Sequence, residues 1–224
     1  MSVGIIVSYD GTANDDDALA LGRMLAGREG KLALAYVRHA SEFDPRREEI
    51  AQHDAERRLE QGASWLGNPD VPRHVVLSPS TGEGLAKLAE REGASVIVFG
   101  SDYRTPPGRV EPGSSAQRLL DGGPVAVAVA PAGMRTRADG TIASIAVSVA
   151  DADGAARESA QVLAELLGAS VVSERRGADL VVVGSQPSAP QGRVALSGAA
   201  RSELDSVRSP VLIVPHGRPL LAAG

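Results

Sequence analysis

Short apolar runs recur along the first 130 residues, and each ends in glycine or a small polar residue. They cover residues 5–7, 32–37, 74–77, 96–99 and 125–129. These runs are too short for helices and too continuously apolar for a sheet with one solvated face. The pattern therefore predicts strands that are buried on both faces and parallel to one another.

The spacing of apolar residues between these runs predicts helices. We expect them at residues 15–26, 45–66 and 114–120, with a further helix opening at Ser80. Three acidic residues lie in the first turn of the first helix, where the helix dipole favours negative charge. Ser80-Thr81-Gly82-Glu83 has the spacing of a capping box. Strands that alternate with helices predict an α/β fold with a doubly wound parallel sheet of flavodoxin or Rossmann type.

The rest of the chain repeats this pattern in shorter form. Residues 181–185 are similar to 97–101, and residues 210–215 are similar to 124–129. The second copy has no counterpart of the long helix, the third strand or the third helix, so we expect its sheet to lack one edge strand. The predicted domains are residues 1–133 and 142–217, joined by a linker at 134–141 and followed by a tail at 218–224.

Composition narrows the function further. The 224 residues are 43% apolar but only 3% aromatic, which predicts an aliphatic core. A net charge of −5 argues against a nucleic-acid partner, and the lack of cysteine excludes disulfides and thiolate metal sites. No apolar run approaches the roughly 20 residues that span a bilayer, and the first residues lack the layout of a secretory signal. We therefore expect a cytoplasmic protein with no membrane partner.

Five motifs occur in a characteristic order. They are Asp10-Gly11-Thr12 after the first strand, the helix at 82–89, the strand at 94–101, Gly113-Ser114, and Pro124-Val125. In this order they resemble the universal stress protein family, in a tandem form with a degenerate second repeat, over nearly the whole chain. The resemblance implies two repeats of the adenine nucleotide alpha hydrolase-like fold.

Family members that bind ATP carry the loop G-x2-G-x9-G-[S/T] after the fourth strand. Gly100 and Gly113-Ser114 match this loop, whereas Tyr103 replaces the middle glycine and Asp102 stands where many members carry arginine. Glycines let backbone N–H groups approach phosphate oxygens, and a helix N-terminus adds unpaired donors. The ring of Tyr103 and the charge of Asp102 oppose this use, because a carboxylate and a phosphate repel each other in a partly desolvated cleft.

The resemblance implies a ligand, ATP or another adenine nucleotide, with or without Mg²⁺. Asp10 of the Asp10-Gly11-Thr12 turn would bind the adenine or ribose, and the backbone of Val37 would line the base pocket. The phosphates would meet the remaining set: Gly100, Gly113, Ser114 and Ser115. No general base is evident, so we expect little or no hydrolysis and no enzyme activity.

The second copy departs further from the family pattern. Asp10 is matched there by Ala150 or Asp151, Pro187 falls at the middle glycine, and Ser197-Gly198 inverts the Gly-Ser order. We expect no nucleotide in this copy. Because family members pair through their last strands, the resemblance implies an antiparallel pseudo-dimer within the chain, and a further homodimer is compatible with it.

Two alternatives stay open. The first is a member that binds no nucleotide and acts through protein–protein contacts, with the cleft closed by Tyr103. The second, more remote, is a calcium-dependent nucleoside hydrolase, since Asp10, Asp16, Asp17 and Ala18 match its D-x-D-x-G-x-D-D-A turn. Thr12 replaces one of its carboxylates, and Ca²⁺ needs six to eight oxygens. A negatively charged first helical turn is the plainer interpretation, so we predict no metal site.

Overall fold

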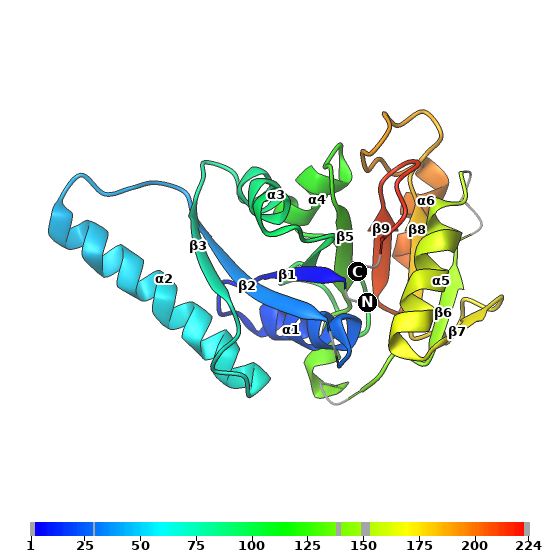
Figure 1. Cartoon of the computed structure of the whole chain (residues 1–224), viewed down its shortest axis with the longest axis horizontal. Helices are drawn as coiled ribbons and strands as arrows, with labels where there is room; N and C mark the ends of the chain where they lie inside the picture. The colour runs from blue at the N-terminus through cyan, green and yellow to red at the C-terminus, as the bar shows by residue number, and fades with distance from the viewer. Residues whose placement is uncertain (1–2, 29, 138–139, 149–152, 222–224) are drawn as a thin grey trace.

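A single twisted sheet runs through the molecule, with helices on both of its faces (Figure 1). The computed structural model describes residues 3–28, 30–137, 140–148 and 153–221. The strand order is β3-β2-β1-β4-β5-β9-β8-β6-β7. The strands are β1 (Gly4–Ser8), β2 (Lys31–Arg38), β3 (Arg73–Leu77), β4 (Val96–Gly100), β5 (Ala126–Ala130), β6 (Ser144–Val147), β7 (Ser170–Val172), β8 (Leu180–Gly184) and β9 (Val211–Val214). The helices are α1 (Ala13–Ala26), α2 (Pro45–Leu66), α3 (Thr81–Glu92), α4 (Ser114–Leu120), α5 (Ala155–Leu167) and α6 (Gly198–Ser206), with a 3₁₀ turn η1 (Met134–Arg137).

The first five strands are parallel, as their apolar sequences predict. One of them departs from the expected burial. β3 lies at the edge of the sheet, and its residues are half-buried or exposed. The prediction that all five strands are buried on both faces is therefore wrong for β3, which has a partner strand on one side only among the described residues.

The helix ends follow from local chemistry, with two corrections. α1 begins at Ala13 rather than residue 15, because the Thr12 hydroxyl accepts from the backbone N–H of Asp15 and caps the helix. α3 begins after Ser80, but the predicted capping box does not form. The Ser80 side chain makes no capping bond, and Glu83 instead accepts from Lys87 one turn later, at 2.7 Å.

Two aliphatic cores lie on opposite faces of the sheet. α1, α2 and α5 cover the first, around buried residues such as Leu19, Leu59 and Leu163. α3, α4 and α6 cover the second, around residues such as Leu85 and Ile97. α1 follows β1 and α3 precedes β4, so the connections at these neighbouring strands lie on opposite faces. Open α/β sheets bind ligands at such a switch point, beyond the carboxyl ends of the strands.

The second half repeats the strand order of the first without its edge strand. β9-β8-β6-β7 follows the same pattern as β5-β4-β1-β2, and the described residues place no strand beyond β7. In the first half α2, β3 and α3 connect β2 to β4, whereas residues 173–179 connect β7 to β8 directly. This arrangement has the topology that the shortened repeat predicts.

The two halves meet through β5 and β9, which pair antiparallel. Ala128 lies opposite Leu212, 84 positions later in the chain, and the flanking pairs are symmetric about it. Two arginines, Arg109 and Arg193, donate hydrogen bonds across this junction, and their separation in sequence equals that of Ala128 and Leu212. Arg109 Nη1 donates to the carbonyl of Asp205 at 2.7 Å, and Arg193 Nη1 donates to the carbonyl of Gly122 at 3.3 Å. Each half therefore contributes one arginine bond to the other across the junction, and a pseudo-dimer with two-fold symmetry stays a prediction.

The same symmetry extends into the loops that follow β4 and β8. The hydroxyl of Ser101 donates to the carbonyl of Ala130, and that of Ser185 donates to Val214, both at 2.7 Å. Each hydroxyl also accepts a backbone N–H ten residues later, at 3.2 Å in both loops. Descent of the halves from one duplicated ancestor, and the domain boundaries set from it, remain predictions.

The segment predicted as a linker is folded where the structure describes it. Its first residues form η1, which packs on α1. None of the described helices combines the length and the apolar character that crossing a membrane requires.

Candidate functional site

The turn between β1 and α1 lies at the carboxyl end of β1, where the resemblance implies that the base and ribose would bind. Gly11 adopts φ +86°, a conformation that favours glycine. The Asp15 carboxylate fills the inside of the turn: its Oδ2 accepts from the backbone N–H groups of Asp10 and Thr12 at 3.1 and 2.9 Å, and from the Thr12 hydroxyl at 2.7 Å. These donors therefore hold the turn together rather than stand open to a ligand.

Asp10 itself keeps an available carboxyl group. Among the described residues its side chain has no hydrogen-bond partner, while its carbonyl accepts from Arg58 Nη1 at 2.8 Å. Although the residue is exposed, partial desolvation of the carboxyl raises its pKa, the negative charge of Asp15 adds to this, and Arg58 opposes it. The guanidinium of Arg58 also lies 5.5 Å from the ring centre of Tyr36, which fixes it over the turn.

Val37 lies beside this turn. The pairing of β1 with β2 ends at Ser8 and Ala35, so Asp10 and Val37 are both two residues past the last pair. β2 continues along β3, where Val37 pairs with Val76, and its side chain is buried. The structure therefore brings Asp10 and the backbone of Val37 to the same edge of the sheet, as the resemblance implies.

Past Val37, a buried arginine ties α2 to the end of β2. The Arg38 guanidinium donates to both carboxylate oxygens of Glu48, at 2.8 and 2.7 Å, and to Gln52 at 3.1 Å. These bonds, together with the backbone N–H of Glu42, lower the pKa of Glu48 to about 2. Sequence reasoning assigned the polar face of α2 to solvent and missed this clamp, because nothing local marks Arg38 as buried.

Gly100 has a structural role that the sequence did not reveal. A Cβ placed there would lie 2.0 Å from the carbonyl oxygen of Asn14, so only glycine lets the first turn of α1 approach β4 this closely. Asn14 secures the approach by donating from Nδ2 to the carbonyl of Ser101 at 2.8 Å. The atoms that approach Gly100 most closely therefore belong to α1.

The loop after Gly100 is compact and turned back on itself. The backbone N–H of Asp102 donates to the carbonyl of Glu111 at 2.8 Å, and its Oδ1 accepts from the N–H of Arg104 at 3.1 Å. Tyr103 is 73% exposed and stacks with the guanidinium of Arg104 at 4.9 Å. The Tyr103 ring therefore projects into solvent, which does not favour the alternative in which it closes the cleft.

Apart from Gly100, the residues that the resemblance assigns to phosphate lie at the start of α4. Gly113 precedes the helix without a side-chain cap, Ser114 is exposed, and Ser115 is half-buried. The Asp102 carboxylate faces the same place, since its Oδ2 lies 3.9 Å from where a Cβ of Gly113 would stand. A phosphate at this helix start would meet that negative charge, as the sequence predicts.

The acidic run after Asn14 serves three separate purposes. Asp15 closes the turn, and Asp16 accepts from the Tyr9 hydroxyl at 3.2 Å. Burial, followed by the charge of Asp16, raises the pKa of Tyr9. Asp17 is fully buried, and its carboxylate accepts from the backbone N–H groups of Gly133 and Arg135 at 2.8 and 2.6 Å and from the Arg135 guanidinium at 3.0 Å.

This division leaves no cluster of ligands for calcium. Among the described residues, no three acidic or histidine side chains are placed to hold a metal ion. Asp17, which the hydrolase pattern requires as a ligand, is instead committed to the segment after β5. Its partners lie more than 110 residues away in sequence, so no local signal could have identified it.

The corresponding region of the second half keeps the loop but begins its helix differently. Ser197 caps α6 by accepting from the N–H of Ala200 at 3.1 Å, and the loop around Pro187 repeats the hydrogen bonds of its counterpart. Ala150 and Asp151, the proposed matches for Asp10, lie outside the described residues.

Comparisons with known proteins agree with this geometry. The model of the universal stress protein family matches residues 3–131. A universal stress protein from Archaeoglobus fulgidus superposes with a TM-score of 0.58 at 15% identity, covering 96% of this chain and 98% of that one. A putative universal stress protein from Pseudomonas aeruginosa gives 0.57 at 17% identity, covering 95% and 92%.

No curated protein sequence matches the chain. At these identities the two solved structures support the fold alone, over nearly the full length of this chain, while the family match covers more than half of it. Together with the parallel order of β1 to β5 and the Gly100 to Ser114 loop, that match places the chain in the universal stress protein family.

Proposed function

We propose that this chain is a regulatory protein that binds an adenine nucleotide at the carboxyl ends of β1, β2 and β4, with little or no hydrolysis. The observation that carries the proposal is that the candidate residues from separate strands lie at the same end of the sheet. Asp10 and Val37 meet at one sheet edge, and Gly100 and the start of α4 belong to the same end of the sheet. This edge is the switch point between α1 and α3, where open α/β sheets take ligands.

The charges at the site refine the ligand. Asp10 offers an acceptor for a ribose hydroxyl or an adenine amino group. Asp102 faces the phosphate side. Two unit charges about 4 Å apart repel by about 1 kcal/mol in water and more when partly desolvated, so each added phosphate charge lowers affinity. We therefore propose that AMP and ADP bind at least as tightly as ATP.

Calorimetric titration with adenosine, AMP, ADP and ATP, with and without Mg²⁺, tests the proposal. Asp10→Asn should weaken all four ligands, because each presents the same base and ribose. Asp102→Asn should tighten ATP by roughly 5-fold or more, from the repulsion above, and leave adenosine unchanged. Asp70→Asn is the matched control, since Asp70 is exposed and lies on the turn before β3. Absence of binding by all four ligands at millimolar concentration would refute the proposal.

A member that acts through protein contacts is the second candidate, and one observation favours it. Figure 1 shows α2 reaching past the edge of the sheet, and Phe43, just before it, is fully exposed while Ile50 is 62% exposed. Exposed large apolar residues on a projecting element are typical of contact surfaces. If the titrations show no nucleotide binding, this candidate replaces the first.

A further inference from the structure

A cavity of about 460 Å³ lies at the amino ends of β4 and β5, at the opposite end of these strands from the candidate nucleotide site. Its position follows from the antiparallel pairing of β5 with β9. Val127 pairs with Ile213, so the amino end of β5 and the carboxyl end of β9 share this end of the sheet. The cavity is thus built by both halves, and for the second half it occupies the carboxyl ends of the strands, where ligand sites form.

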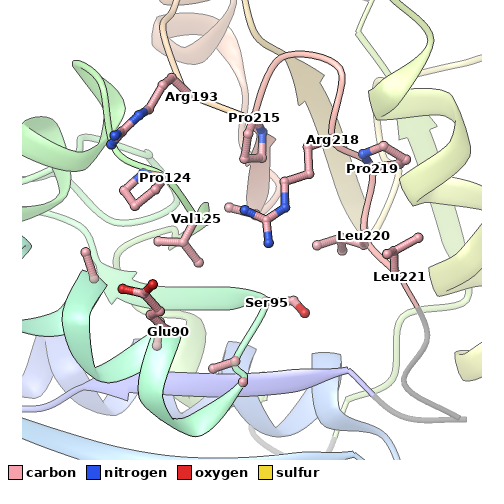
Figure 2. Close-up of a pocket in the computed structure, with 15 residues that line it drawn as sticks. Glu90, Ser95, Pro124, Val125, Arg193, Pro215, Arg218, Pro219, Leu220 and Leu221 are labelled. Carbon is pink, nitrogen blue, oxygen red and sulfur yellow. The ribbon is translucent and has the colours of Figure 1, made fainter. Parts of the chain in front are cut away.

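Figure 2 shows how the lining side chains are arranged. The guanidinium of Arg218 projects into the middle of the cavity, and the Glu90 carboxylate, from α3, lies on the other side. The Ser95 hydroxyl lies below Arg218. Val125 and Leu220 supply apolar wall, and Pro124, Pro215, Pro219 and Leu221 surround them.

The segment that carries Arg218 is held firmly on both sides. The backbone N–H of Gly217 donates to the Asp153 carboxylate, and that of Leu220 donates to the buried Ser159 hydroxyl at 2.9 Å. The N–H of Arg218 itself donates to the carbonyl of Pro215 at 3.3 Å. Arg218 is therefore presented from an anchored turn, which lowers the ordering cost of binding.

Three polar side chains that line this cavity lack partners among the described residues. In the part of the chain that the structure describes, the side chains of Arg218, Glu90 and Ser95 make no hydrogen bond or ion pair with one another or with other residues. Arg193 also lines the cavity, but its guanidinium turns toward the carbonyl of Gly122. One available guanidinium beside apolar wall fits an anionic head group on an apolar body.

We propose that this cavity binds a small monocarboxylate with an aliphatic or aromatic body. The planar guanidinium of Arg218 matches a carboxylate in a bidentate fashion, Ser95 supplies a further donor, and Val125 and Leu220 cover the apolar part. Glu90 opposes a second negative charge in the same space, which selects monoanions over phosphates and dicarboxylates. The site is independent of the nucleotide proposal, since it shares no residue with it.

Hexanoate, hexanamide and inorganic phosphate are suitable probes, titrated into the full-length chain by calorimetry and by ligand-observed NMR. Hexanoate should bind with a millimolar or lower Kd, whereas hexanamide and phosphate should bind at least 10-fold more weakly. Arg218→Gln should weaken hexanoate at least 10-fold. Glu90→Gln should strengthen hexanoate by about 2- to 5-fold and phosphate by more, because it removes a like charge.

Arg46→Gln, an exposed change on α2, is the matched control and should leave hexanoate binding unchanged. Arg218 is exposed, so its replacement should leave the melting temperature within about 2 °C of the parent. The proposal is overturned if hexanoate fails to bind at 20 mM (roughly ten times the weakest affinity expected of such a site). It is equally overturned if hexanamide binds as tightly as hexanoate, or if Arg218→Gln leaves the affinity unaltered.

Discussion

Replacement of Asp17 by asparagine should destabilise the protein strongly, although Asp17 lies outside the candidate ligand sites. The side chain is fully buried and accepts from two backbone N–H groups and from the Arg135 guanidinium. Asparagine keeps the shape but replaces one acceptor oxygen by an NH₂ group. That group then faces a donor N–H, so at least one hydrogen bond is lost and two donors are opposed.

The magnitude follows from these contacts. Hydrogen bonds to a charged group contribute about 1.5–3 kcal/mol each, and breaking a buried ion pair from one side costs about 3–5 kcal/mol. Arg135 is 38% exposed and can regain water, which lowers the cost. We expect a loss of about 2–4 kcal/mol in the free energy of unfolding, or roughly 5–15 °C in melting temperature for a chain of this size.

Urea denaturation of Asp17→Asn, Arg135→Gln and the double variant measures this loss and its sharing between partners. Arg135→Gln alone should cost less, because both backbone N–H groups keep their acceptor, and the cycle should give a coupling of about 1–2 kcal/mol. Glu49→Gln on the exposed face of α2 is the control. A loss below about 1 kcal/mol for Asp17→Asn would show that the carboxylate does not secure the segment after β5.

Three further outcomes follow from the structure. The pKa of Glu48 is lowered to about 2, so its bond to Arg38 stabilises the fold above the ordinary carboxyl pKa, and this stabilisation is lost as the pH falls from about 4.5 to 2. Urea denaturation should show wild type more stable than Glu48→Gln at pH 6 but equal to it near pH 2. A difference in stability that stays constant with pH would contradict this prediction. Gly100→Ala should lower the free energy of unfolding by about 2–4 kcal/mol, since its Cβ would overlap the Asn14 carbonyl. Gly113→Ala should lower it by less than about 1 kcal/mol, because no atom lies nearer than 3.9 Å to the added Cβ. Equal shifts in melting temperature for the two variants would refute this. Arg109→Ala and Arg193→Ala should each cost about 0.5–1.5 kcal/mol in urea denaturation, because each removes one bond between the halves, and a large difference between them would argue against equivalent roles.

Local sequence signals were sufficient for most of the fold. Asp44, Pro45 and Gly67 bracket α2 at its observed ends, since an acceptor before the first turn and a left-handed glycine after the last are encoded nearby. Val96 to Gly100 and its neighbours are apolar enough to predict a buried parallel strand. Ser80 shows the limit of such signals. The sequence placed Glu83 where it could bond to the backbone of Ser80 or to Lys87, and in the structure it accepts from Lys87.

The candidate site was predictable in place but not in detail. Asp10, Val37, Gly100 and Gly113 come to one end of the sheet, as strand order requires. What surrounds them depends on contacts between distant segments. Gly100 is glycine because of Asn14, 86 positions earlier, and no pattern in either sequence segment reveals that approach. The sequence left open an alternative in which Tyr103 closes the cleft, whereas in the structure its side chain is 73% exposed and stacks with Arg104.

The pairing of β5 with β9 changes how this protein responds to dilution. In a dimer of separate chains, the corresponding contact would weaken as the concentration falls, because association costs translational freedom. Here a covalent connection fixes the local concentration of one strand near the other, so the junction persists at any expression level. Each partner can also acquire substitutions that the other does not share, which a symmetric assembly of identical subunits cannot do. One half can therefore change at a given position while the other half keeps its residue there.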